Sequence, residues 1–132
     1  MARKITAIRR YRPEIERMPT RQTQEIIEEM CRSTTLSRGV IRNVVAQLQE
    51  VLMDNFHEGR AAKLEGLGTF TPTIRMDGSL DVLFRPEPDM LRKLNAKTQL
   101  KAKILNKASI GKSADDLVAR WNAEHPEDPV EE

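Results

Sequence analysis

The sequence predicts a mixed α+β fold with two helices, a three-stranded antiparallel sheet and a short closing helix. Apolar residues recur at every fourth position over residues 40–56, which is the period of one helix face. From residue 62 onward, apolar and polar residues alternate, which is typical of half-buried strands. Glycine and proline separate these segments and indicate where each element ends.

The chain length suits one domain with tails, because it has 132 residues. Apolar residues make up 39% and charged residues 32%, so we expect a small core with long solvated or partner-bound segments. The expected segments are a basic N-terminal arm or edge strand (1–20), a central domain (21–97), a basic extension (98–112) and an acidic C-terminal helix and tail (113–132). Pro13 and Pro19 disfavour a long helix in the first segment.

Two helices are expected at the start of the central domain. The first is predicted to begin after Thr20 or Thr23, either of which can cap it. The second has Ser37 as its expected N-cap and Gly59 as its left-handed C-cap. Its apolar stripe consists of Val40, Val44, Leu48, Leu52 and Phe56. A broad stripe over about five turns needs more cover than one short helix supplies.

Three strands are expected to follow, with a break at the glycines of residues 66–68. The register of the last two depends on the loop that joins them. A two-residue loop would place Asp81 opposite Ile74 and so bury a charge. We prefer a three-residue loop over residues 76–78, which pairs Ile74 with Leu80, Pro72 with Val82 and Phe70 with Phe84. It also places Gly78 at the left-handed position of the turn.

The C-terminal third is expected to contain two short helices. Asp89 is predicted to cap the first, and Ser113 the second. Between them, residues 90–112 contain seven basic residues and no acidic residue. Trp121 belongs to the apolar stripe of the second helix, and residues 127–132 are expected to be disordered.

The charge distribution is typical of proteins that bind nucleic acid. The net charge is only +2, but residues 113–132 carry −6 and the remaining residues carry +8. No apolar run approaches the roughly 18–20 residues of a membrane helix, and no secretory signal is recognised. A single cysteine, Cys31, fits a reducing cytosol. We therefore expect a cytoplasmic protein.

Catalytic and metal-binding patterns are not found in the sequence. His57, His125 and Cys31 have no metal-ligand spacing, and the glycines of residues 66–68 lack the rest of a dinucleotide fingerprint. We expect a protein that is not an enzyme, with no cofactor, no metal and no small-molecule substrate.

Several motifs of the central domain resemble the bacterial histone-like HU and integration host factor family. They are Thr35-Leu36-Ser37 before the long helix, Gly66-Leu67-Gly68-Thr69-Phe70, and Phe84-Arg85-Pro86 followed by Leu91-Arg92-Lys93-Leu94. The basic extension before the first helix looks most like the divergent HU-like proteins of Bacteroidetes. The resemblance implies an HU-like fold, an intertwined homodimer, and sequence-tolerant binding to double-stranded DNA in the bacterial nucleoid.

One departure from the family concerns the hairpin. HU-like proteins extend it into long basic arms with a proline at the tip, whereas only residues 76–79 stand between Arg75 and Leu80 here. We therefore expect little DNA bending. The runner-up interpretation is a structural or protein-interaction module on the same fold without DNA binding.

The candidate site residues fall into two groups. The expected DNA-binding residues, which would neutralise phosphates, are Lys63, Arg75, Arg85, Arg92, Lys93, Lys97, Lys101 and Lys103. The arginines Arg9, Arg10 and Arg12 are a secondary set. The expected dimer core is Val40, Val44, Leu48, Leu52, Phe56, Phe70 and Phe84. The acidic C-terminal segment either weakens DNA binding in cis or completes the core, and the sequence slightly favours inhibition.

Overall fold

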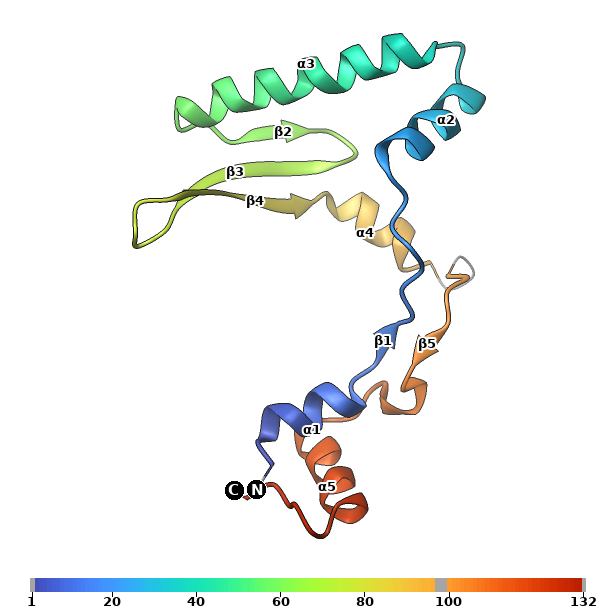
Figure 1. Ribbon diagram of the computed structural model, residues 1–132, viewed down its shortest axis with the longest axis vertical. Helices are drawn as coiled ribbons and strands as arrows, with labels where there is room; N and C mark the ends of the chain where they lie inside the picture. Colours follow the sequence, from blue (N-terminus) through green and yellow to red (C-terminus); the bar gives the residue numbers. More distant parts are fainter. Residues whose placement is uncertain (1, 97–99, 132) are drawn as a thin grey trace. The chain divides into compact units, whose positions relative to one another are not determined.

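The computed structural model describes residues 2–96 and 100–131 (Figure 1). The chain divides into two compact units. We call Thr20–Leu100 the central unit, and Met1–Pro19 together with Lys101–Glu132 the terminal unit. The central unit is thus an insertion between the two segments that build the terminal unit.

The described residues of the central unit form three helices and one sheet. Its helices are α2 (Thr23–Ser33), α3 (Arg38–His57) and α4 (Pro88–Leu94), and its strands are β2 (Ala62–Leu64), β3 (Gly68–Ile74) and β4 (Leu80–Pro86). β3 lies between β2 and β4, and both pairs are antiparallel. α3 runs alongside this sheet (Figure 1). The predicted α+β order of elements is confirmed.

The ends of α3 follow the prediction, whereas the starts of α2 and α4 do not. The Ser37 hydroxyl accepts a hydrogen bond from the Val40 N–H at 3.3 Å, and Gly59 has a φ of +76°. The N-cap of α2 is Gln22, without a side-chain capping bond, so neither predicted threonine caps it. The N-cap of α4 is Glu87, because Pro88 suits the first helical position and starts the helix before Asp89.

The hairpin register is confirmed over the whole length of β3 and β4. Ile74 pairs with Leu80, and Phe70 pairs with Phe84, whose ring centroid lies 4.8 Å away. The Arg75 N–H donates to the Ser79 carbonyl at 2.9 Å, which leaves three residues in the loop. Gly78 has a φ of +87°, as the predicted turn requires. No arm extends from this hairpin.

The break between β2 and β3 brings two strands very close together. A Cβ atom on Gly68 would lie 2.3 Å from the Arg85 carbonyl oxygen and 2.7 Å from the Phe84 ring. Only glycine permits this approach. The predicted break at residues 66–68 is confirmed, because β2 ends at Leu64 and the Leu67 N–H donates to the Leu64 carbonyl at 3.1 Å.

The terminal unit is made of short elements from both segments. These are α1 (Lys4–Tyr11), β1 (Glu14–Ile15), β5 (Ile104–Leu105), the 3₁₀ helix η1 (Lys107–Ser109) and α5 (Ala114–Glu124). The prediction of an arm or edge strand for the first residues is wrong, because α1 is a helix. Ala7 and Tyr11 lie one helical turn apart and are both buried, and α1 packs against α5. Among residues 2–20, only Glu14 and Ile15 form a strand, β1.

The acidic tail is ordered within the terminal unit. Ser113 and Asp116 form the predicted cap of α5, with reciprocal bonds between side chains and backbone. Beyond α5, the indole N–H of Trp121 donates to the Asp128 carbonyl at 2.8 Å. Val130 is 8% exposed, and its N–H donates to the Asn122 side chain at 2.7 Å. Predicted disorder is wrong for residues 127–131, because an apolar side chain and backbone hydrogen bonds fix them.

Candidate nucleic-acid interface

The outward face of the central sheet carries a row of polar side chains across all three strands. Lys63 pairs with Thr69, and Thr69 pairs with Arg85. Directly paired residues share one face of a sheet, and neighbouring strands lie about 4.8 Å apart. Lys63 and Arg85 therefore stand roughly 10 Å apart on the face opposite Phe70 and Phe84.

The two cations of this row have different surroundings. The Lys63 ammonium lies 3.6 Å from a carboxylate oxygen of Glu87, whose side chain is mostly buried. Arg85 is exposed and forms no ion pair with any residue that the structure describes. Arg85 is therefore the more available of the two for a phosphate.

The hairpin tip is neutralised by its own contacts. The guanidinium of Arg75 binds a carboxylate oxygen of Asp81 at 2.6 Å, and this hydrogen bond holds the pKa of Asp81 below its ordinary value. The hydroxyl and N–H of Ser79 both donate to Asp77, which lowers the pKa of that carboxyl. Arg75 is thus less free to bind a phosphate than its sequence position predicts.

The basic residues after the sheet do not form one continuous surface within a single unit. Arg92 forms an ion pair with Asp89 one turn earlier in α4, whereas Lys93 has no ion-pair partner among the described residues. Lys101 and Lys103 belong to the terminal unit. The predicted site residue Lys97 lies outside the described residues.

The central unit as a whole carries no net charge. Residues 20–100 contain eleven basic and eleven acidic residues. The excess of positive charge that the sequence shows outside the C-terminal segment belongs instead to residues 1–19 and 101–112 of the terminal unit. The prediction of one basic body therefore overstated the charge beside the sheet, because that charge is divided between two units.

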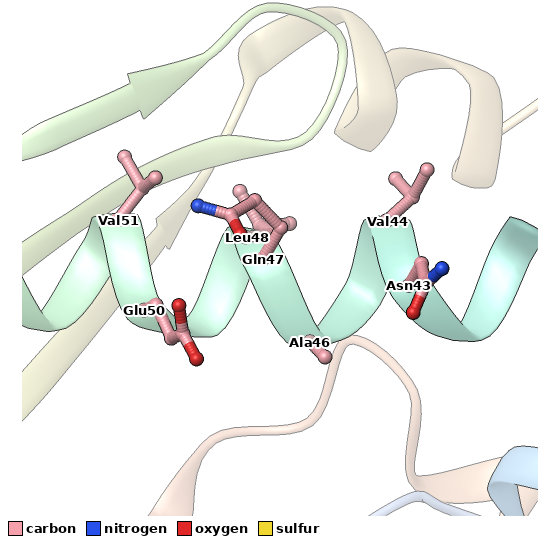
Figure 2. Close-up of a pocket in the computed structure, with 7 residues that line it drawn as sticks. All are labelled: Asn43, Val44, Ala46, Gln47, Leu48, Glu50 and Val51. Carbon is pink, nitrogen blue, oxygen red and sulfur yellow. The ribbon is translucent and has the colours of Figure 1, made fainter.

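Large apolar surfaces of the central unit remain uncovered in one chain. Figure 2 shows Val44, Leu48 and Val51 projecting from one side of α3, with Ala46 and Glu50 on the opposite side. Val44 is 58% exposed, although it belongs to the predicted apolar stripe. Contiguous apolar surface of this kind marks an interaction site.

A second apolar surface lies where the end of α3 faces the hairpin. An open groove there is lined mainly by Met53, Phe56, Pro72, Ile74, Leu80 and Val82. Ile74 and Leu80 are each 71% exposed. Of the predicted dimer core, Leu48, Leu52, Phe56 and Phe70 are half-buried, whereas Val40, Val44 and Phe84 are exposed. The structure thus places all seven residues on surfaces that one chain leaves at least partly open.

The comparison with protein families decides the affiliation. A family model described as HU-HIG, an HU domain fused to wHTH, Ig, or Glycine-rich motif, matches residues 6–82, more than half of the chain. The chain belongs to the HU-HIG family. The match begins inside α1 and ends inside β4, so it includes residues of both units. No curated protein matches the chain.

Two kinds of feature are absent from the described residues of this HU-HIG chain. No group of three or more histidine, cysteine, aspartate or glutamate side chains there could hold a metal ion. No helix in that part of the chain is both long and apolar enough to cross a membrane.

Proposed function

We propose that the chain binds double-stranded DNA without sequence preference, as a non-enzymatic homodimer of the HU type. Its membership of the HU-HIG family is the observation that carries this proposal. The likeness to the HU-like proteins of Bacteroidetes and a place in the bacterial nucleoid are part of the same proposal. No cofactor and no small-molecule substrate take part in it.

The dimer would form through the apolar stripe of α3 and the apolar face of the sheet. This is supported by the exposure of Val44 and by the open groove beside Ile74 and Leu80. A second chain that covers both surfaces would remove from water the area that a single chain leaves exposed. The outward face with Lys63 and Arg85 would stay free for DNA.

Binding would proceed through phosphates. Among the predicted DNA-binding residues of the central unit, Arg85 and Lys93 have no ion pair to a described residue, whereas Lys63 lies beside the Glu87 carboxylate. Phosphate contacts position a protein without reading bases, so affinity would not depend on sequence. It would fall with salt, because each neutralised phosphate releases counterions.

The direct test is a fluorescence-anisotropy titration of a 30-base-pair duplex with the full chain over a series of salt concentrations. The variant R85Q and the double variant K63Q/R85Q should bind more weakly. The slope of log K against log salt should fall by about 0.9 for each phosphate that the variant no longer neutralises. A matched control is R32Q/R42Q, which removes two exposed helix cations without an ion pair to a described residue. If K63Q/R85Q and R32Q/R42Q have equal slopes, the sheet face is not the DNA site.

A protein-interaction module without DNA binding is the second candidate. The zero net charge of the central unit and the ion pairs of Lys63, Arg75 and Arg92 favour it. In that case the exposed apolar surfaces would bind another protein. No binding to duplex DNA at 50 mM salt, where phosphate contacts are strongest, would support this alternative over the first.

A further inference from the structure

In the terminal unit, several exposed basic side chains have no ion-pair partner among the described residues. The acidic side chains of α5, by contrast, form hydrogen bonds or ion pairs within the unit. We infer that this unit carries a second DNA-binding surface, formed by Arg9, Arg10 and Lys107, which we call the terminal basic cluster. The inference rests on the proposed DNA binding by the chain, but it concerns a different surface from the central sheet.

The backbone brings the members of the cluster together. Arg9 and Arg10 stand in the last turn of α1. The side-chain amide of Asn106 donates to the carbonyls of Arg10 and Arg12, at 3.0 and 3.1 Å. Lys107 follows Asn106 directly and begins η1. Asn106 therefore fixes Lys107 beside the end of α1, although the two segments are nearly a hundred residues apart in the chain.

The backbone at Asn106 adopts an unusual conformation to make this junction. Its φ of +54° and ψ of +40° place it in the left-handed region, which asparagine tolerates better than most residues. It is the one non-glycine residue with positive φ in the described parts of the chain. The junction between α1 and η1 therefore depends on asparagine at position 106, for both its side-chain amide and its backbone conformation.

The cations of the cluster are free of ion pairs. Arg9, Arg10 and Lys107 are all exposed, and none of them pairs with an acidic side chain among the residues described. By contrast, Arg12 lies 2.7 Å from a Glu14 oxygen and is already neutralised. The predicted secondary set of three arginines is therefore reduced to two.

All three acidic residues of α5 have partners inside the unit. Asp115 binds the Lys4 ammonium at 2.9 Å, and Asp116 caps α5 through Ser113. Glu124 accepts hydrogen bonds from Tyr11 and Arg120. The ion-pair partners of Asp115 and Glu124 are thus Lys4 and Arg120, and neither acid pairs with a cation of the cluster.

Two further acids of the unit, Glu131 and Glu16, lie beside other residues. Glu131 lines a groove with Lys4 and Asp115, at the beginning of α1. The Glu16 N–H bonds to the Lys103 carbonyl, so Glu16 lies beside Lys103. For that reason we leave Lys103, a predicted DNA-binding residue, out of the cluster.

Duplex DNA is the partner that this arrangement fits. DNA carries one negative charge per roughly 1.7 Å of its axis, so closely placed cations on a helix end meet several phosphates. Because both units belong to one chain, the second contact would be intramolecular once the first has formed. The alternative partner is an acidic protein. A competition experiment, in which polyglutamate is tested for displacement of the duplex, distinguishes these two partners.

The test measures binding of the full chain to a 30-base-pair duplex across a salt series. We expect R9Q/R10Q and K107Q to weaken binding and to lower the salt slope by about 0.9 for each phosphate that is no longer neutralised. The double variant R9K/R10K should keep the slope, because a phosphate contact needs the charge. The matched control R32Q/R42Q, like R9Q/R10Q, removes two positive charges, and its salt slope should equal that of the unsubstituted chain. Thermal unfolding of each variant verifies that the terminal unit remains folded.

The outcomes separate the two proposals. If the unsubstituted chain does not bind DNA, the proposed function fails. If it binds and R9Q/R10Q has the same slope as R32Q/R42Q, only the inference about the terminal basic cluster is overturned. If R9Q/R10Q lowers the salt slope and K63Q/R85Q does not, the result supports DNA binding by the terminal basic cluster and contradicts DNA binding by the sheet face. If polyglutamate displaces the duplex from the unsubstituted chain but not from R9Q/R10Q, the cluster selects acidic protein and the inference is wrong.

Discussion

The phenol of Tyr11 donates a hydrogen bond to the carboxylate of Glu124, 113 residues further along the chain. The same ring packs edge-on against Trp121 at 6.3 Å, and the Arg120 guanidinium lies 4.3 Å from its centroid. This cluster joins α1 to α5. It raises the pKa of Tyr11, chiefly through the bond to Glu124, and it lowers the pKa of Glu124.

The stability of the terminal unit should therefore decline at both ends of the pH scale. A lowered Glu124 pKa gives stability above its ordinary value of 4.5, which is lost as the pH falls through the folded-state pKa. A raised Tyr11 pKa gives stability below 10.0, which is lost as the pH rises through the folded-state value. Trp121 is the only tryptophan, so its fluorescence during thermal unfolding reports on this unit.

The variant Tyr11→Phe removes the hydroxyl but keeps the ring. It should abolish the alkaline decline and raise the Glu124 pKa toward 4.5, which a side-chain NMR titration would measure. The bond from Arg120 remains, so part of the acid-side decline should persist. A pH profile identical to that of the unsubstituted chain would contradict the assigned role of this hydrogen bond.

Deleting residues 127–132 should destabilise the terminal unit. The deletion exposes the site that Val130 covers and removes the acceptor of the Trp121 indole, a loss of about 1–3 kcal/mol. We expect a lower melting temperature and red-shifted fluorescence. The control E127Q/E131Q changes only charge and should melt like the parent. A gain in DNA affinity without any loss of stability would instead favour inhibition by the acidic tail.

The dimer prediction is tested on α3. Val44→Asp should give a monomer or an unfolded chain, and Leu48→Asp should prevent folding, because each would bury an unpaired charge. Ala46→Asp, on the opposite side of the helix, is the control and should remain dimeric (Figure 2). Light scattering at micromolar concentration gives the mass. A monomer mass for the unsubstituted chain at every concentration would rule out the proposed dimer.

Alanine substitutions at two glycines should change the free energy of unfolding in opposite directions. Gly68→Ala would force a Cβ atom to 2.3 Å from the Arg85 carbonyl, which should cost about 1–3 kcal/mol or more. Gly39 lies in α3 with no atom within 4 Å of the Cβ position, so Gly39→Ala should stabilise by about 0.5–1 kcal/mol. Chemical denaturation measures both. Equal effects of the two substitutions would contradict the close approach of the strands.

DNA bending by the chain should be small. The hairpin closes over residues 75–79, and its tip carries Asp77 and Gly78 where a wedge residue would have to stand. An energy-transfer assay on a doubly labelled duplex measures the bend. A bend near roughly 90°, of the size known for strongly kinking proteins, would contradict this expectation.

The sequence predicts the central unit well because its patterns are local. The stripe on α3 and the pairing of Ile74 with Leu80 depend on periodicity and on one glycine, and both signals lie within a few residues. The outward positions of Lys63 and Arg85 follow from the same alternation. The ion pair of Lys63 does not follow from it, because Glu87 reaches Lys63 from beyond β4.

The sequence predicts α5 and its cap at Ser113, but it does not predict α1 or the packing of α1 against α5, because the core of the terminal unit combines short segments that are distant in the chain. Ala7 and Tyr11 are one turn apart, but this pair alone is too short to indicate a packed helix. The charge and the two prolines of the N-terminal segment favoured an arm instead. The spacing of four residues in both pairs, Ala7 with Tyr11 and Leu117 with Trp121, considered together, indicates two short helices that can pack against each other.

The insertion of the central unit imposes an order on synthesis. α1 is synthesised before the central unit, yet its packing partner α5 and the backbone bridge from Ala2 to Val130 exist only after residue 130 has been made. Until then Tyr11 has no apolar surface to bury it. Folding of the central unit shortens the effective loop between the two segments and so lowers the entropic cost of closing it. A ribosome-bound chain stalled before α5 should therefore already form the sheet, whereas the α1–α5 contact should form only in chains long enough to expose α5.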